Sequence, residues 1–220
     1  MLGFGLPALA LARPNEDFWE SKDPKDWTDD ERKQILTNSP WARLAQVKYN
    51  SGASGLGMMG MNGSRRGGGG RMPTATQGTT DTKDAPPLPT HYDAVVRWES
   101  ALPIREAVKV KSKDDPAANY ILCVTGDLPM LGKASNDETD DEYAQRLEML
   151  KQYTKLEKRG DPIYLVRCGY SKDGALFYFE RNDLITTHDG SVTFVTKLGP
   201  LDIKCKFSVK EMVYRGKLEL

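Results

Sequence analysis

The sequence predicts an α+β fold: a mainly antiparallel sheet with two or three short-to-medium helices and a long disordered loop. Residues 163–170, 175–180, 191–198 and 201–209 are alternating or apolar runs separated by turn sequences, as in consecutive antiparallel strands. Residues 103–111 and 140–159 carry apolar side chains at helical spacing. Residues 51–90 hold 10 of the 20 Gly and no Val, Ile or aromatic residue, so they cannot offset the entropy of ordering and are predicted to be disordered.

The length and charge of the chain limit the number of domains and the kinds of partner. Without the Gly-rich tract, the 220-residue chain keeps about 170 residues, enough for one sizeable core. We therefore predict a single domain made of residues 13–50 and 91–220, with residues 51–90 as an insertion. The 31 Lys and Arg balance the 31 Asp and Glu, so no overall field attracts nucleic acid as a partner. No run approaches the roughly 18 apolar residues of a transmembrane helix.

The first residues have the pattern of an export signal. Residues 1–12 are apolar and end in Ala10-Leu11-Ala12, which has the small-x-small form of a cleavage site. No Lys or Arg precedes the apolar run, which a start codon assigned too far downstream would explain. We predict export to the periplasm or the extracellular space. The alternative is a cytoplasmic protein whose apolar N-terminal segment packs or frays.

The segment that follows contains three of the four Trp: Trp19, Trp27 and Trp41. Thr28 and Glu31 have capping-box spacing, which predicts a helix over residues 29–37 that ends before Pro40. Because a helix this short is not stable alone, we expect the Trp side chains to pin this arm to the sheet. The alternative is an exposed Trp platform for a carbohydrate or a peptide.

The remaining elements are predicted in chain order. Residues 43–49 and 92–99 have strand patterns and are predicted to be antiparallel neighbours joined by the Gly-rich tract. Residues 120–125 form the most continuously apolar run and are predicted to be a central strand. The helix over residues 140–159 is predicted to be the longest and to end at Gly160. Residues 212–220 are predicted to add one short strand.

Sequence motifs for catalysis are missing. Neither His91 nor His188 stands beside a nucleophile motif, and Ser54 lacks the Gly-x-Ser-x-Gly elbow. The sequence has no dinucleotide fingerprint and no phosphate-binding loop, so no cofactor is predicted. The alternative function is a hydrolase with a spatially assembled acid or His site, whose acids would come from loops: Asp127 with Asp183 or Asp189.

Two groups of side chains in the Gly-rich tract are candidate ligand sites. Arg65, Arg66 and Arg71 form a weak Arg/Gly motif of the kind that binds RNA, and the simpler interpretation is a loop kept in solution by its charges. Thioethers suit copper(I), but the four Met of the tract are irregularly spaced and no metal site is predicted: Met58, Met59, Met61 and Met72.

The three cysteines do not form a zinc motif. Cys123, Cys168 and Cys205 are far apart, and none has Cys-x-x-Cys or Cys/His spacing. Each lies in an apolar or alternating run, so we expect buried thiols on strands. One disulfide with an odd thiol is the alternative.

Several short motifs carry a resemblance to a known group. They are Phe18-Trp19-Glu20-Ser21-Lys22-Asp23-Pro24, Trp27-Thr28-Asp29-Asp30-Glu31, Ser39-Pro40-Trp41-Ala42, Arg97-Trp98-Glu99-Ser100-Ala101 and Gly216-Lys217-Leu218-Glu219-Leu220. In these motifs the chain resembles secreted acidobacterial proteins of unknown function, some of which are labelled GWxTD domain-containing. It departs from the motif that names the domain, because Asp26 stands where Gly is expected and Thr28 follows Trp27 with no intervening residue. The resemblance implies export and an undefined role, and it supplies no catalytic residues.

The sequence therefore supports one leading hypothesis, an exported, non-enzymatic protein that binds an envelope protein or polymer. No catalytic residue, metal or cofactor is predicted. The candidate binding residues are the Trp and Arg clusters: Trp19, Trp27, Trp41, Arg65, Arg66 and Arg71.

Overall fold

The computed structural model of the protein describes residues 17–50, 92–109, 115–128 and 139–220. Across these ranges the fold is α+β, with a large antiparallel sheet, four α-helices and three short 3-10 helices. This confirms the predicted fold class. The predicted export signal, His91 and the Gly-rich tract lie outside the described residues, and so do the Arg and Met clusters of the tract: Arg65, Arg66, Arg71, Met58, Met59, Met61 and Met72.

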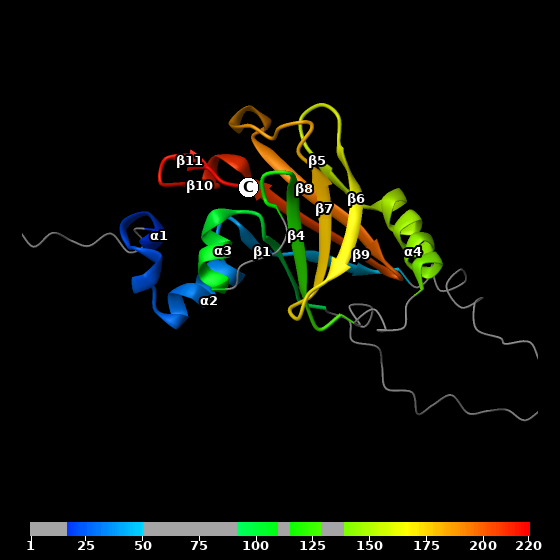
Figure 1. The fold of residues 1–220 in the computed structure, drawn as a ribbon, viewed down its shortest axis with the longest axis horizontal. Helices are drawn as coiled ribbons and strands as arrows, with labels where there is room; N and C mark the ends of the chain where they lie inside the picture. The colour runs from blue at the N-terminus through cyan, green and yellow to red at the C-terminus, as the bar shows by residue number, and fades with distance from the viewer. Residues whose placement is uncertain (1–16, 51–91, 110–114, 129–138) are drawn as a thin grey trace, which may run out of the picture.

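The main sheet has nine strands, and each pairs antiparallel with its neighbours in the order β1-β3-β4-β7-β6-β5-β8-β9-β2 (Figure 1). In chain order they are β1 (Ala42–Leu44), β2 (Gln46–Tyr49), β3 (Ala94–Trp98), β4 (Asn119–Gly126), β5 (Lys155–Glu157), β6 (Ile163–Tyr170), β7 (Ala175–Glu180), β8 (Ser191–Leu198) and β9 (Leu201–Ser208). The strands from β6 to β9 begin and end at or within one residue of their predicted bounds.

The two ends of this sheet meet in one stretch of chain. β1 pairs with β3, β2 pairs with β9, and only Ala45 separates β1 from β2. The Ala45 amide donates to the Ala94 carbonyl at 2.8 Å, so the change of pairing partner from β3 to β9 takes place at this residue. The predicted pairing of residues 43–49 with residues 92–99 is therefore correct only for β1. It is wrong for β2, because the twist that accumulates over many strands brings β9 round to this edge.

The enclosed face of the sheet holds the core. Along β9, Leu201, Ile203, Cys205 and Phe207 are buried, whereas the alternate Lys204 and Lys206 are exposed. Aromatic rings from different strands meet edge to face inside, with Trp98 at 5.6 Å from Tyr120 and 5.8 Å from Phe207 between ring centroids. β4, the predicted central strand, has β3 on one side and β7 on the other. The alternation predicted from sequence thus decides which side chains fill the core.

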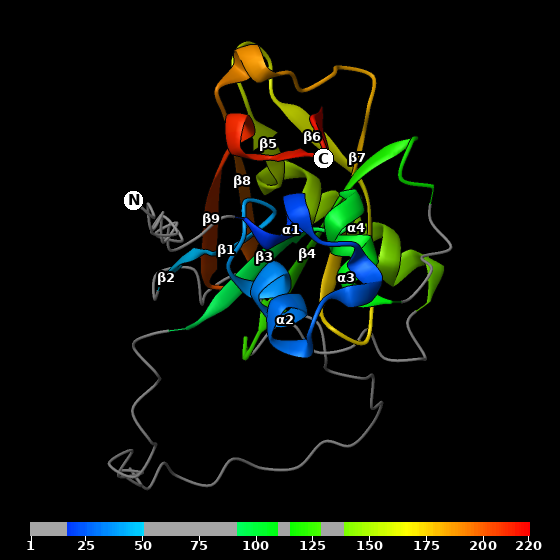
Figure 2. The same cartoon turned by 90° about the vertical axis from the view of Figure 1, so that its left-hand side faces the viewer.

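Three helices lie on one side of the sheet, α1 (Phe18–Ser21), α2 (Asp29–Thr37) and α3 (Leu102–Val108), as Figure 2 shows. α2 starts at the predicted capping box, in which the Thr28 hydroxyl accepts from the Glu31 amide at 3.2 Å and the Glu31 carboxylate accepts from the Thr28 amide at 2.8 Å. α3 carries Pro103 in its first turn, as predicted, and ends at Lys109, whose φ is 58°. The 3-10 helices are η1 (Pro24–Asp26), η4 (Thr187–Asp189) and η5 (Val209–Glu211).

The fourth helix, α4 (Asp140–Tyr153), lies on the opposite side of the molecule from α1 to α3 (Figure 1). The predicted end of this helix at Gly160 is wrong. The chain leaves the helix at Thr154, whose buried hydroxyl bonds the Thr196 hydroxyl at 2.7 Å, and β5 then pairs with both β6 and β8. Pairing on both sides outweighs the helical propensity of residues 155–157. Among the described helices, none combines the length and the apolar character that crossing a membrane requires.

The N-terminal arm, residues 17–41, is held by a C-terminal hairpin. Trp41 packs edge to face between Trp19 and Tyr214, at 6.0 and 6.1 Å between centroids, and its indole nitrogen donates to the Glu219 carbonyl at 2.9 Å. The predicted single strand over residues 212–220 is in fact two strands, β10 (Val213–Tyr214) and β11 (Lys217–Leu218). The chain turns at Arg215 and Gly216, both with positive φ.

The Gly-rich tract can be tested by shortening it. We expect that a four-residue turn containing Asn-Gly in place of Gly52–Pro87 leaves the fold intact and stabilises it by about 1 kcal/mol, because the cost of loop closure falls with the logarithm of length. The nine residues then left between Asn50 and Tyr92 can span about 30 Å, so β2 can still pair with β9. The far-UV circular dichroism spectrum and the melting temperature report both effects.

A matched variant separates length from sequence. A Gly-Ser linker of the native length should give the wild-type melting temperature. Loss of the folded spectrum in the shortened chain would contradict the prediction that the tract is a dispensable insertion.

Candidate functional site

An open groove with a volume of about 1020 Å³ lies between the N-terminal arm and the strands where the sheet closes. The arm contributes Gln34, Asn38 and Pro40 to one wall. The other wall is formed by side chains from β1, β9 and η5: Arg43, Leu44, Lys204, Lys206 and Lys210. This groove is the candidate site.

The groove forms because β1 and β9 lie side by side without forming a ladder. β2 accompanies β9 only as far as Lys204, and β1 pairs with β3 instead. On the buried side of this junction the Cys205 thiol fills the space, at 3.7 Å from the Arg43 carbonyl and 3.9 Å from the Leu44 carbonyl. On the outer side, the alternation of β9 directs Lys204 and Lys206 into the groove.

The basic side chains of the groove are only partly paired with carboxylates. Arg43 is paired with Glu211, and the Lys204 ammonium lies 3.8 Å from the Glu157 carboxylate. Within the described part of the chain, no carboxylate lies within ion-pair distance of Lys206 or Lys210. The wall formed by β9 and η5 therefore presents two exposed ammonium groups without a counter-charge.

Leu44 gives the groove an apolar contact. Its side chain is 69% exposed, the largest exposed fraction among the large hydrophobic residues described. It lies on β1 between Arg43, which is half-buried, and Ala45, which carries the switch to β2. An apolar side chain beside cationic groups in a groove suits a partner with both apolar and anionic groups.

The three Trp predicted as weak binding residues lie inside the protein. Trp19, Trp27 and Trp41 are 5%, 4% and 0% exposed, and they pack against one another through Phe18 and Tyr214. Trp19 borders the groove although little of its side chain is accessible. These rings pack the arm onto the sheet, and a stacking platform would require exposed ring faces.

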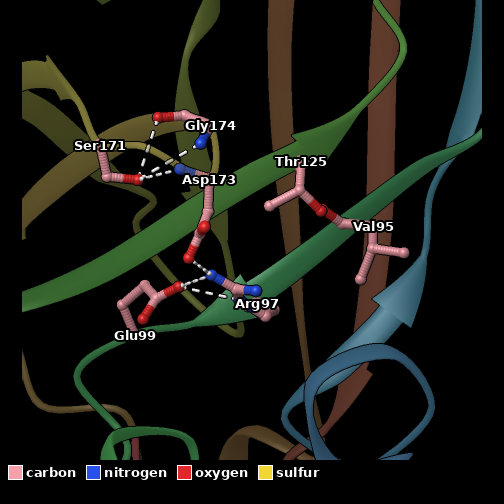
Figure 3. Close-up of polar contacts among 7 residues, drawn as sticks. All are labelled: Val95, Arg97, Glu99, Thr125, Ser171, Asp173 and Gly174. Atoms are coloured by element: carbon pink, nitrogen blue, oxygen red, sulfur yellow. Dashed lines mark hydrogen bonds and ion pairs between the residues drawn. The ribbon is translucent and has the colours of Figure 1, made fainter. Parts of the chain in front are cut away.

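A second polar cluster lies on the outer face of β3 and β4. Arg97 reaches between the carboxylates of Glu99 and Asp173 (Figure 3), with its Nε 2.8 Å from Glu99 and a terminal nitrogen 3.4 Å from Asp173. The Ser171 hydroxyl accepts from the Asp173 and Gly174 amides at 3.2 and 3.3 Å, which fixes the turn that carries Asp173. The guanidinium is occupied by two carboxylates, so this cluster connects β3 to the β6–β7 turn.

The thiol beside this cluster is not an activated nucleophile. Cys123 is paired with Arg97 across the β3–β4 ladder and is fully buried. Burial raises the pKa of the Cys123 thiol to about 12, and the Glu99 carboxylate adds to the rise while Arg97 opposes it. Burial likewise raises the pKa of Cys205 to about 12. Reactive cysteines require the opposite shift, because the thiolate is the nucleophile.

Cys123, Cys168 and Cys205 form no disulfide, so the predicted alternative of one disulfide with an odd thiol is wrong.

We therefore predict that Cys123 and Cys205 resist alkylation in the native protein. Iodoacetamide at pH 8, followed by peptide mapping by mass spectrometry, should leave both unmodified, and both should react at once in urea because unfolding restores an ordinary pKa. Native modification of either cysteine at the rate of a small-molecule thiol would contradict the structure. Free glutathione in the same tube provides that reference rate.

Of the acids of the predicted hydrolase site, Asp127 is not brought together with Asp183, whereas Asp183 and Asp189 both act on Lys158. Asp183 accepts from the Lys158 ammonium at 2.7 Å, and this hydrogen bond raises the pKa of Lys158. Asp189 accepts from the Thr186 amide at 2.7 Å beside the exposed His188. Asp127 follows β4 at the end opposite to the one where β7 leads to Asp183, about 25 Å away along the strand.

Metal ligands are not gathered either: the described ranges contain no group of three or more His, Cys, Asp or Glu that could hold an ion.

The groove residues were not predicted from the sequence, although one signal pointed to two of them. Lys204 and Lys206 alternate with apolar residues in Ile203-Lys204-Cys205-Lys206-Phe207, which predicts that both point outward.

Comparison with protein-family models, with curated proteins and with solved structures finds no match.

Proposed function

We propose that this protein is an exported, non-enzymatic binding module of the cell envelope, and that the groove between its arm and β9 is the partner-binding surface. The observation that carries the proposal is the groove itself. It combines an exposed Leu44 with two unpaired ammonium groups, Lys206 on β9 and Lys210 on η5. Sites with an apolar contact and a few placed polar groups are typical of binding surfaces.

The chemistry of the described residues favours binding over catalysis. The buried thiols keep their protons, and the Arg97 cluster is internally paired. A hydrolase would need at least two acids, or an acid and a His, facing one cavity. Asp127 and Asp183 lie at opposite ends of β4, and neither lines the groove.

The export half of the proposal rests on the sequence. Residues 1–12 have the apolar run and the Ala10-Leu11-Ala12 pattern of a cleaved signal, and the resemblance to secreted acidobacterial proteins points the same way. N-terminal sequencing of the protein from its native host tests this half. We expect a mature chain that begins at Arg13 in an envelope or extracellular fraction. A chain that keeps Met1 and is found in the cytoplasm would overturn it.

The groove half is tested with a pair of surface variants. Leu44→Asp places a charge in the groove, and Leu184→Asp places the same charge at a site with similar exposure, 62% against 69%, outside the groove. In a pull-down from envelope extract, a partner of the groove should be retained by the wild type and by Leu184→Asp and lost by Leu44→Asp. Equal recovery with both variants would place the partner elsewhere and sink the groove as the binding surface.

A further inference from the structure

We propose that the groove takes an extended, acidic polypeptide segment, whose carboxylates contact the lysine wall formed by Lys204, Lys206 and Lys210 and whose apolar side chains contact Leu44. This inference rests on the proposed function, since it names the chemistry of the partner for the same groove. The occupant is a protein segment and not a nucleic acid or a small anion.

The basic wall has the repeat of an extended chain. Lys204 and Lys206 are two positions apart on one face of β9, so their side chains leave the sheet about 7 Å from each other. Lys210 on η5 continues this wall. An extended peptide that runs along β9 presents its alternate side chains with the same spacing, because the period of an extended chain is also two residues. Carboxylates at positions i and i+2 therefore match Lys204 and Lys206, and a further acid along the segment can reach Lys210.

The opposite wall suits a peptide backbone. Gln34 and Asn38 of the arm line the groove on this side, and Gln46 of β2, the ladder partner of Lys204, lines it on the lysine side. Nothing in the described ranges hydrogen-bonds to their side-chain amides. Each amide offers a donor and an acceptor, which are the groups that a peptide unit needs. These three residues can therefore pair with the main chain of the occupant while the lysines take its carboxylates.

The distribution of charge distinguishes a peptide from a nucleic acid. Asp17 and Glu20 stand on the arm side of the groove, and Glu211 of η5, which is paired with Arg43, lines it as well. A nucleic acid carries a phosphate at every unit and would meet these carboxylates, whereas an extended peptide can place its acids on the lysine side alone. Stacking of bases also needs exposed aromatic faces, and Trp19, the aromatic residue of this groove, is 5% exposed.

The test uses a fluorescein-labelled peptide of alternating Glu and Val residues and the full chain. Fluorescence anisotropy should show binding that weakens as salt is raised, because exposed charges are screened. We expect the double variant Lys206→Glu, Lys210→Glu to bind about tenfold more weakly, since two favourable contacts become repulsive. The control Lys151→Glu, Lys172→Glu makes the same change of net charge outside the groove and should bind like the wild type.

The competing outcomes are distinct. No binding of the Glu/Val peptide, or the same loss in both double variants, would overturn the proposal. So would equally tight binding of a peptide in which the Glu residues form one block, because the alternation would then have no role. An oligo-dT that binds as tightly and needs the same lysines would make the groove a general polyanion site.

Two further measurements keep the result interpretable. If the charge-reversed protein loses its far-UV spectrum, Lys206→Gln with Lys210→Gln tests the same contacts without repulsion. If the peptide fails to bind but a partner from envelope extract still depends on Leu44, the acidic segment is wrong and the groove remains the binding surface. If neither is seen, the proposed function fails as well.

Discussion

Trp41→Ala is expected to lower the free energy of unfolding by about 3–5 kcal/mol, the usual cost of removing a large buried aromatic side chain. Trp41 is fully buried, and its ring packs edge to face against Trp19 and Tyr214. Its indole N–H is the donor to the Glu219 carbonyl. Alanine removes the packing and the hydrogen bond together, so the arm and the C-terminal hairpin lose their common contact. Urea unfolding followed by circular dichroism measures the loss.

Two other variants separate the causes. Trp41→Phe keeps most of the ring contacts and loses the N–H, so we expect a smaller cost of about 1–2 kcal/mol. Tyr153→Ala removes an aromatic ring that is 50% exposed on α4 and should change stability by about 0.5 kcal/mol or less. If Trp41→Ala cost no more than Tyr153→Ala, the arm would not be anchored as the structure describes.

Gly174→Ala is the second substitution with a large expected effect. A Cβ atom at this position would lie 2.1 Å from the Val124 carbonyl oxygen and 2.9 Å from its carbon. These atoms belong to the backbone of β4, which cannot move without disturbing its pairing with β3 and β7. We expect a loss of about 3 kcal/mol or more, at the upper end for overpacking. The contact between Asp173 and Arg97 should loosen at the same time, because Asp173 lies in the same turn as Gly174.

Gly169→Ala is the matched control. It lies on β6, and its added Cβ would be 3.8 Å from the Tyr178 ring, an ordinary contact. This substitution should be neutral or stabilise the protein by up to about 1 kcal/mol, since alanine restricts the unfolded chain. Equal melting temperatures for the two variants would show that the β6–β7 turn does not approach β4 as closely as described.

Elements with local signals were predicted well. α2 begins at its capping box because Thr28 and Glu31 are three residues apart and satisfy each other's amides. The β8–β9 hairpin follows from two alternating runs joined at Gly199-Pro200. In both cases the residues that decide the structure are neighbours in the sequence.

Elements decided by distant partners were predicted poorly. Residues 155–157 leave the helix because β6 and β8 pair with them on both sides. The sequence of residues 155–157 does not show this pairing, although both strands were predicted. The switch at Ala45 depends on β9, which lies more than 150 residues further along the chain. Sequence periodicity gives the face of each strand, but it does not say which strand will close a curled sheet.

The candidate site shows the same division. The outward direction of Lys204 and Lys206 follows from the alternation of β9. Their position opposite the arm does not, because it depends on how Trp41 packs between Trp19 and Tyr214. The clustered Trp indicated correctly that the arm is anchored. They did not indicate that anchoring the arm leaves a groove beside it.

The hold of the C-terminal hairpin on the arm sets the order in which the protein can fold. The hydrogen bond from Trp41 to Glu219 spans 178 positions, and the one from the Arg215 amide to Glu20 spans 195. Contacts between such distant residues form late, because long stretches of chain must be ordered first. On the ribosome the arm therefore waits for residues 215–219 to emerge, and a chain that has not reached them lacks the contacts that hold the arm beside the groove. The ability to bind a partner would then report that this hairpin has been made and has folded onto the arm.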